Sequence, residues 1–257
     1  MFDFLYYISL NTFLFYSLFL LCIVYAIFFF QSKPLKNEGF SQRERFVVNT
    51  GPDIFDDFYC QIYDTLHKTS LIEFTEMIKV TNPSKDSVFL DVGSGTGDTV
   101  FRLTQMGYRA YGIEKSPAMI RVSQKKHPTI RIIQGDVMDP MTFDNDTFTH
   151  ILCMQSTINY IQDKYTFFRY CYSWLKSGGY LILHLEELPT KTMVFNGVKY
   201  DTYKKDNEWI ERFVDKKSGN VRENEHCLYV EPISEMDRKA IDCGFKKEAE
   251  GVYKRIK

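Results

Sequence analysis

The chain has 257 residues, of which 44% are hydrophobic and 25% are charged, and its formal net charge is −1. These values are typical of a globular chain with a substantial core, built as one large domain or as one domain with an appendage. The balanced charge gives no electrostatic case for a nucleic acid as the main partner. The six cysteines form no Cys-x-x-Cys pair, which favours free thiols over a zinc site or a disulfide framework.

The N-terminal segment is strongly apolar, because Asp3 is the only charged residue before Lys33. A helix over residues 4–30 would be about 40 Å long, more than the roughly 30 Å of a membrane's hydrocarbon core. A buried core helix is seldom apolar on every face, and a signal peptide begins with basic residues. Basic residues follow the segment and none precedes it. The positive-inside rule therefore predicts a single-pass membrane anchor over residues 1–32, with the later chain on the cytosolic side and a linker over residues 33–52.

A glycine motif follows an apolar run at residues 88–98, which read VFLDVGSGTGD. The run predicts a strand that ends near Asp91, a Gly-x-Gly-x-Gly turn and then a helix over the following residues. Glycines let a ligand approach the backbone closely, and the helix start offers free N–H groups to a polar or anionic group. The third glycine comes one residue earlier than in the dinucleotide fingerprint. The pattern therefore predicts a nucleotide-like ligand other than a dinucleotide.

Residues 90–97, LDVGSGTG, resemble the first motif of class I S-adenosylmethionine-dependent methyltransferases. The resemblance implies an α/β fold over residues 53–257, with a Rossmann-like, seven-stranded, mostly parallel sheet, a C-terminal antiparallel hairpin and helices on both faces. It also implies S-adenosyl-L-methionine as the cofactor. Loop residues implied to contact the cofactor are Asp91, Gly93, Ser94, Gly95 and Gly97, with Asp91 near the ammonium group.

Two further acidic residues stand at the ends of the next predicted strands. Glu114 follows a strand over residues 109–113, and a carboxylate there can accept hydrogen bonds from both ribose hydroxyls. A plain surface glutamate is the alternative. The resemblance assigns Asp136 and Val137, after a strand over residues 129–133, to the adenine ring, although an ordinary acidic turn would look the same. It also places Lys115, Met119 and Met154 at the cofactor. Tyr63, in a helical region over residues 53–80 that would cover the cofactor, is predicted to reach it, although Tyr63 could equally be a packed residue.

The region that faces the methyl group and the acceptor is less distinctive. Residues 155–160 leave the predicted fourth strand without an Asn/Asp-Pro-Pro-Tyr motif, and Cys153 has no adjoining proline, so DNA-base and cytosine methylation are disfavoured. A neutral acceptor must lose a proton, and histidine is the usual base. His184, near the end of the fifth strand, and Tyr160 are the candidate catalytic residues, although His184 could equally be a packed residue. Asn159, Glu186 and Glu187 are further candidates at the rim.

The last part of the chain changes pattern again. Residues 188–232 predict an inserted β-ribbon after the fifth strand, which would cover the site and influence the choice of acceptor. A helix over residues 234–243 and a strand hairpin would complete the fold.

The sequence predicts methyl transfer from S-adenosylmethionine to a small-molecule, lipid-like or membrane-associated acceptor. Two alternatives stay open: a scaffold that binds the cofactor without catalysis, and an aminopropyl transferase on the same fold. The oligomeric state is not predicted.

Overall fold

The computed structural model describes residues 10–31, 45–67, 71–185, 188–206 and 208–256. The chain divides into two compact units, residues 1–41 and 42–257. The first unit contains helix α1 (Leu10–Gln31), and the start of the predicted anchor lies outside the described residues. Within the part of the chain that is described, no helix reaches the combined length and apolarity needed to cross a membrane. The predicted membrane anchor over residues 1–32 is therefore not supported.

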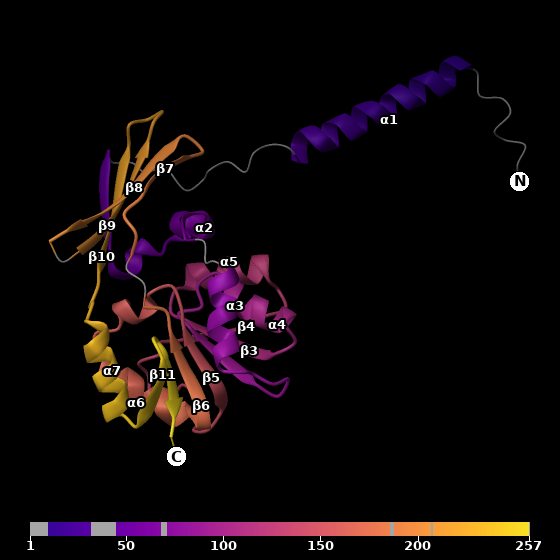
Figure 1. The fold of residues 1–257 in the computed structure, drawn as a ribbon. Coiled ribbons are helices and arrows are strands. Elements are labelled where there is room, and N and C mark those ends of the chain that lie inside the picture. Colours follow the sequence, from indigo (N-terminus) through magenta and orange to yellow (C-terminus); the bar gives the residue numbers. More distant parts are fainter. Residues whose placement is uncertain (1–9, 32–44, 68–70, 186–187, 207, 257) are drawn as a thin grey trace, which may run out of the picture. The chain divides into compact units, whose positions relative to one another are not determined.

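The second unit is built on a seven-stranded sheet with the strand order β11-β12-β6-β5-β2-β3-β4 (Figure 1). The five neighbouring strands β6, β5, β2, β3 and β4 run parallel to one another. The C-terminal strand β12 pairs antiparallel with both β6 and β11. This topology confirms the predicted Rossmann-like, mostly parallel sheet with a C-terminal hairpin. The strands are β2 (Val88–Val92), β3 (Arg109–Glu114), β4 (Arg131–Gln134), β5 (Phe148–Cys153), β6 (Leu175–Leu183), β11 (Phe245–Ala249) and β12 (Val252–Arg255).

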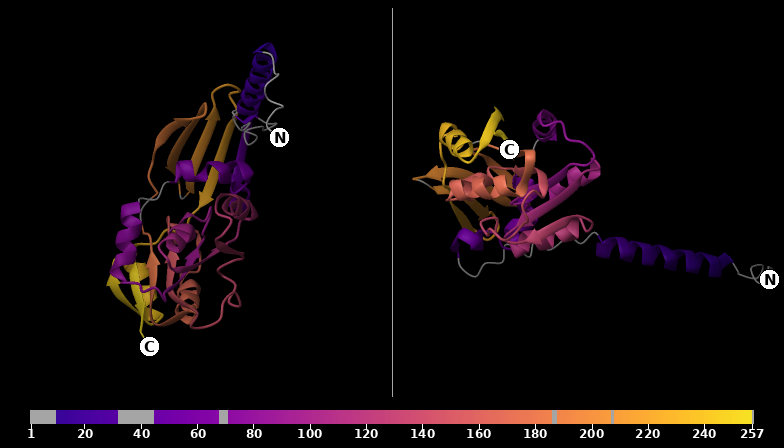
Figure 2. Two further views of the ribbon diagram at one scale, coloured as in Figure 1. Left: turned by 90° about the vertical axis from the view of Figure 1, so that its right-hand side faces the viewer. Right: turned by 90° about the horizontal axis from the view of Figure 1, so that it is seen from below.

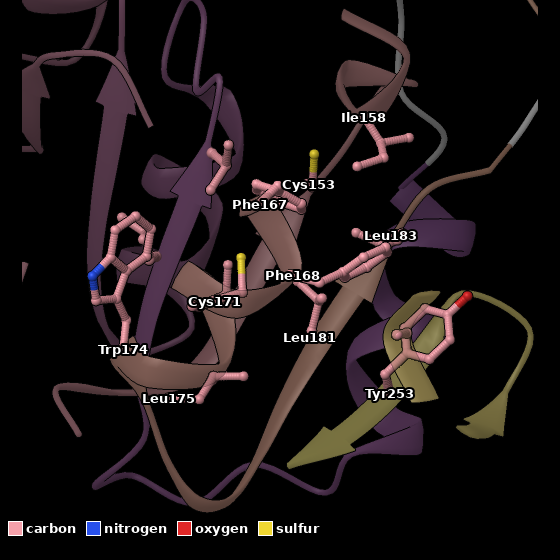
Figure 3. Packing of buried hydrophobic residues seen from close by; sticks show 14 of the residues in the cluster. Cys153, Ile158, Phe167, Phe168, Cys171, Trp174, Leu175, Leu181, Leu183 and Tyr253 are labelled. Carbon is pink, nitrogen blue, oxygen red and sulfur yellow. The ribbon is translucent and has the colours of Figure 1, made fainter. Parts of the chain in front are cut away.

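Helices cover both faces of this sheet, as its apolar parallel strands require. On one face, α6 (Lys164–Trp174) and α7 (Ile233–Asp242) pack against the sheet, and Figure 3 shows Phe167, Phe168 and Trp174 among the buried side chains there. On the other face, α3 (Leu71–Val80) and α4 (Asp98–Gln105) contribute apolar side chains such as Phe74 and Leu103. Helix α5 (Pro117–Lys126) begins with Ser116 as N-cap and Pro117 in its first turn, a start that is typical of helices.

A second, five-stranded sheet has the order β1-β10-β9-β8-β7. Four of its strands come from the predicted ribbon: β7 (Thr192–Phe195), β8 (Val198–Lys205), β9 (Glu208–Asp215) and β10 (Val221–Cys227). The fifth, β1 (Phe46–Thr50), lies within the predicted linker and pairs in parallel with β10. The boundary between the units accordingly falls after Ser41 rather than at the predicted residue 52. The insertion is thus a sheet completed by a strand from before the main fold, and not a free ribbon.

Helix α2 (Asp57–Leu66) lies between the two sheets, as the views in Figures 1 and 2 agree. Asp56 caps it by accepting a hydrogen bond from the N–H of Tyr59, at 2.9 Å. Arg222 of β10 holds the same end, because its guanidinium donates to the Asp56 carboxylate at 2.6 Å and to the carbonyl of Ile54 at 3.0 Å. The second sheet is therefore attached to the helix that precedes the main sheet.

The central strand β5 offers a direct test of the core. Leu152 is fully buried between the helices and the neighbouring strands, so Leu152→Ala should lower the free energy of unfolding by about 2–5 kcal/mol. Urea denaturation would measure this loss. Met141→Ala, at a side chain that is 87% exposed, is the control and should change stability by less than about 0.5 kcal/mol. Equal losses in the two variants would contradict the described packing.

Candidate functional site

The glycine turn joins β2 to α4 in a conformation that requires glycine. Gly93 and Gly97 have φ values of +65° and +84°, in the left-handed region where other residues are strained. A Cβ atom at Gly93 would lie 2.6 Å from the Thr157 side chain, and one at Gly97 would lie 2.4 Å from Ile130. The turn is tied to β3 because the N–H groups of Gly93 and Ser94 both donate to the carbonyl of Ile113. The loop therefore presents its backbone at the carboxyl end of the sheet.

Glu114 sits at the tip of β3 and contacts this loop directly. One carboxylate oxygen accepts from the N–H of Gly95 at 2.8 Å, and the other accepts from the N–H of Ser116 at 2.8 Å. Burial raises the pKa of Glu114, although these hydrogen bonds oppose the rise. An ionised carboxylate has about four acceptor positions, and the N–H of Lys115 is a third backbone donor, so one position stays available for a hydroxyl of a ribose. The predicted role of Glu114 fits this geometry.

Asp91 and Ser94 are buried polar residues behind the turn. Burial and the nearby Glu114 carboxylate raise the pKa of Asp91 well above its ordinary value, and a hydrogen bond from the Thr99 hydroxyl opposes this. Ser94 is 7% exposed, and its hydroxyl has no hydrogen-bond partner among the described residues. Buried polar groups are normally paired. The donor and acceptor set therefore suits a polar, partly cationic ligand such as the amino-acid end of S-adenosylmethionine.

The residues assigned to the adenine ring lie beyond Glu114. Asp136 forms an ion pair with Lys115 at 2.8 Å and accepts from the N–H of Met138 at 2.9 Å. Burial alone would raise the pKa of Asp136, but these two contacts outweigh it and lower the pKa. Val137 is half-buried against the core, and Met119 packs with Cys60 and Ala118 beneath α2. Lys115 thus contacts Asp136, and the cofactor contacts predicted for these residues stay predictions.

A cavity of about 300 Å³ opens beside the glycine turn. Three of the predicted cofactor residues line it: Tyr63, Ser94 and Gly95. The other lining residues were not among the predicted site residues: Asp64, His67, Thr96, Asp98, Thr99, Arg102 and Gln155. His67 lies four residues after the predicted Tyr63, and residues at this spacing share a helix face, so the sequence could have indicated His67. Arg102 has the same spacing from Asp98 and could have been indicated in the same way. Arg102 brings a cation to the cavity wall, and a carboxylate of the ligand could pair with it.

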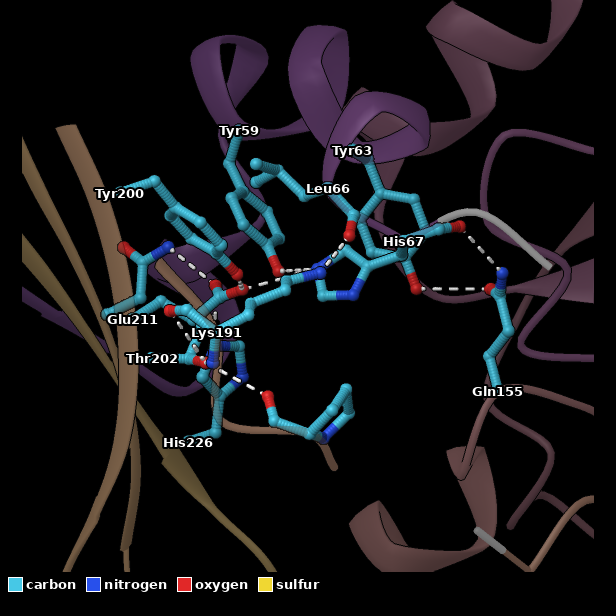
Figure 4. Close-up of polar contacts among 12 residues, drawn as sticks. Tyr59, Tyr63, Leu66, His67, Gln155, Lys191, Tyr200, Thr202, Glu211 and His226 are labelled. Atoms are coloured by element: carbon cyan, nitrogen blue, oxygen red, sulfur yellow. Dashed lines mark hydrogen bonds and ion pairs between the residues drawn. The ribbon is translucent and has the colours of Figure 1, made fainter. Parts of the chain in front are cut away.

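A buried polar cluster adjoins the cavity and is centred on Glu211 of β9 (Figure 4). Its carboxylate lies 3.2 Å from Nε2 of His67, 2.9 Å from Nε2 of His226 and 2.5 Å from the hydroxyl of Tyr200. Asn224 donates to it as well, at 3.3 Å. Burial alone would raise the pKa of Glu211, but the hydrogen bonds and charges of His226 and His67 hold the pKa well below its ordinary value. The cluster therefore contains an ionised carboxylate between two histidines.

The predicted catalytic residues lie outside the cavity wall. The hydroxyl of Tyr160 is 2.8 Å from Nδ1 of His226, at the far side of the cluster. His184 follows β6, where its N–H donates to the carbonyl of Cys153 at 3.0 Å, and it is not among the residues that line the cavity. Met154 is 5% exposed and packs in the core with Phe74. Asn159 is buried and its carbonyl accepts from the N–H of Tyr229, whereas residues 186–187 lie outside the described part of the chain.

The raised pKa of Asp91 predicts how stability depends on pH. An acid whose pKa is higher in the folded protein binds more protons there, so its ionisation costs stability as pH rises from about 3.9 towards the raised value. Asp91→Asn lacks this cost, and its stability relative to the natural protein should therefore increase with pH over that range. Urea unfolding in a pH series without ligand would measure it.

The control for this series is Asp163→Asn, at an exposed helix cap. Hydrogen bonds from the side chain and N–H of Thr166 lower the pKa of Asp163, so its variant should lose stability relative to the natural protein as pH rises. If the difference in the free energy of unfolding between Asp91→Asn and the natural protein does not change with pH, the raised pKa of Asp91 is contradicted.

Comparisons with known proteins agree with the fold and with the loop. Residues 90–183 match the model of a family described as a methyltransferase domain. An uncharacterized methyltransferase of Alkaliphilus oremlandii is 27% identical over 131 residues, which are 50% of this chain and 57% of that protein. The chain spans about half the length of the curated relatives that it matches.

Solved methyltransferase structures resemble the chain over most of its length. The CcbJ methyltransferase from Streptomyces caelestis aligns with a TM-score of 0.65 and 15% identity, over 80% of this chain and 100% of that one. CalS10, an amino pentose methyltransferase from Micromonospora echinaspora solved with S-adenosylmethionine bound, aligns with a TM-score of 0.59 and 20% identity, over 77% of this chain and 96% of that one. At these identities the likeness establishes the fold. Residues 90–183 therefore match a methyltransferase domain, and the unit that contains them has the Rossmann-like α/β fold of the solved methyltransferase structures.

Proposed function

We propose that the protein transfers a methyl group from S-adenosylmethionine to a small-molecule acceptor. The observation that carries the proposal is the contact of Glu114 with the N–H of Gly95, because it joins the ribose-binding carboxylate to the glycine turn. The cofactor supplies a methyl carbon that its sulfonium group activates for displacement. The chain's own contribution is to bind, orient and exclude water.

Each part of the site has a role in this proposal. Glu114 accepts from a ribose hydroxyl, and Asp136 with the N–H of Val137 binds the adenine edge. The glycine turn and Asp91 hold the amino-acid end, where an ionised Asp91 would meet an ammonium group that offsets the cost of its burial. Tyr63 and Gln155, whose side chains are joined at 3.3 Å, cover the cavity from α2 and from the end of β5.

The acceptor class rests on the size of the cavity and on one protein of similar fold. A cavity of about 300 Å³ is at the lower end of the range for small-molecule sites. One of the solved structures with this fold belongs to an amino pentose methyltransferase, which favours a small polar acceptor. A lipid-like acceptor and a location at the cytosolic side of a membrane stay predictions.

Glu114→Gln tests the binding site, because it keeps the size of the side chain and removes the charge. The affinity for S-adenosylmethionine should fall by about 1.5–3 kcal/mol, as expected when hydrogen bonds to a charged group are lost. Equilibrium dialysis with labelled cofactor would measure it. Glu248→Gln, at an acid outside the site, should bind like the natural protein, and an equal affinity in all three proteins would remove Glu114 from the site.

Transfer itself requires a separate experiment. The full chain would be incubated with methyl-labelled S-adenosylmethionine and a small-molecule extract of the cells that contain it. A labelled product, absent with Glu114→Gln at limiting cofactor, is the expected result. Binding of the cofactor without any labelled product would favour the scaffold alternative, and transfer of the aminopropyl group in place of the methyl group would favour the aminopropyl alternative.

A further inference from the structure

We propose that His67 is the general base that takes the proton from the acceptor, and that Glu211 positions it. This assignment rests on the proposed function and adds the class of acceptor: a phenol hydroxyl or an amine. His67 ends α2, where its N–H donates to the carbonyl of Tyr63 at 2.8 Å, and it lines the cavity beside the glycine turn. Figure 4 shows it between the Glu211 cluster and Gln155.

The hydrogen bonds of the cluster determine which nitrogen of His67 carries the proton. An ionised carboxylate only accepts, so the Glu211 oxygen that lies 3.2 Å from Nε2 of His67 favours the tautomer with the proton on Nε2. The Tyr59 hydroxyl oxygen is 3.0 Å from the same nitrogen. No hydrogen bond to Nδ1 of His67 is found among the residues that the structure describes. In that tautomer Nδ1 keeps a lone pair, and the carboxylate behind the ring fixes the orientation of the imidazole.

His226 contacts the same carboxylate but differs from His67 in two respects. Its Nε2 donates to Glu211 at 2.9 Å, while its Nδ1 already accepts from the Tyr160 hydroxyl at 2.8 Å. Its side chain is 2% exposed, against 21% for His67. Both nitrogens of His226 are thus engaged within the protein, and only His67 of this pair is placed to meet a ligand.

Other titratable groups around His67 are poorer proton acceptors. Burial and the carboxylates of Glu114 and Glu211 raise the pKa of Tyr63, and burial with Glu211 raises the pKa of Tyr59, so both phenols stay protonated. Lys191 donates to the carbonyl of Leu66; burial lowers its pKa, although Glu211 opposes this. Asp64, on the cavity wall, is occupied by Lys126 and by the hydroxyl of Thr96.

The proposed step balances in atoms and charge. The acceptor oxygen or nitrogen forms a bond to the methyl carbon, the methyl–sulfur bond breaks, and its electron pair remains on sulfur, which becomes neutral. The acceptor's proton moves to Nδ1 of His67, and the resulting imidazolium lies against the Glu211 carboxylate. A phenol can lose its proton to Nδ1 as the new bond forms, whereas an alkylammonium group must lose its proton to Nδ1 before its nitrogen has the electron pair for attack; both groups have pKa values of about 10.

The test compares His67→Gln with His226→Gln in the full chain, using the labelled-cofactor assay. His67→Gln should lower the transfer rate by about 10²–10⁴-fold. Its affinity for S-adenosylhomocysteine, measured by calorimetry, should stay within about threefold of that of the natural protein. His226→Gln is the matched control at the same carboxylate and should keep the pH dependence of the natural protein. Thermal unfolding would verify that each variant is folded.

The pH dependence separates a base from a merely structural residue. The transfer rate of the natural protein should fall as the pH is lowered, because a protonated imidazole ring cannot accept a proton. His67→Gln should lack this dependence, and added imidazole should restore part of the rate of His67→Ala. Glu211→Gln should lower the transfer rate as well, since the neutral amide no longer holds His67 through its Nε2.

The two proposals fail in different ways. A natural protein that is folded but neither binds S-adenosylhomocysteine nor forms a labelled product would overturn the proposed function. A natural protein that transfers the methyl group, while His67→Gln keeps both its rate and its pH dependence, would overturn the assignment of His67 alone.

Discussion

The arrangement of this protein depends on one buried carboxylate. Glu211 lies on the face of β9 that packs against α2, with no exposed surface of its own. A buried charge is costly unless it is paired, and removing one partner of such a pair typically costs about 3–5 kcal/mol. Glu211 meets His67 at the end of α2, His226 on β10 and Tyr200 on β8. The contact therefore fixes the second sheet to α2, and α2 carries the side chains that close the cavity.

This attachment explains how an insertion far along the chain reaches the site. The loops of α/β sheets vary freely, and ligands bind at the carboxyl ends of the strands. Here the insertion contributes no residue to the wall of the described cavity, but it holds His67 and, through α2, Tyr63. Arg222 adds a second attachment at the other end of α2, through Asp56. The insertion thus influences the cavity indirectly, by supporting α2.

Most of the main fold could be predicted from the sequence because its signals are local. The apolar run before Asp91, the glycine turn and the Ser-Pro start of α5 each need only a few adjacent residues. Glu114 was predictable for the same reason, since its place at a strand end follows from the pattern around it. The strand β1 was not, because it is formed by pairing with β10 at a distant part of the chain. The Glu211 cluster has the same long-range origin.

One local signal of the cluster was nevertheless present. In β9, Trp209, Glu211 and Phe213 alternate along the strand, so all three share a face. A lone acid on an otherwise apolar face requires buried partners, and histidines and tyrosines are suitable ones. The sequence alone could not tell which of the five histidines would meet it, because that depends on how the two sheets pack.

The central claim is that the glycine turn, Glu114 and the adjoining cavity form one binding site for S-adenosylmethionine. Calorimetric titration of the folded full chain with this cofactor tests it most directly. Saturable binding of one molecule per chain, displaced by S-adenosylhomocysteine, is the predicted result. A folded chain that gives no binding heat at any temperature tested, and retains no labelled cofactor in dialysis, would contradict the account.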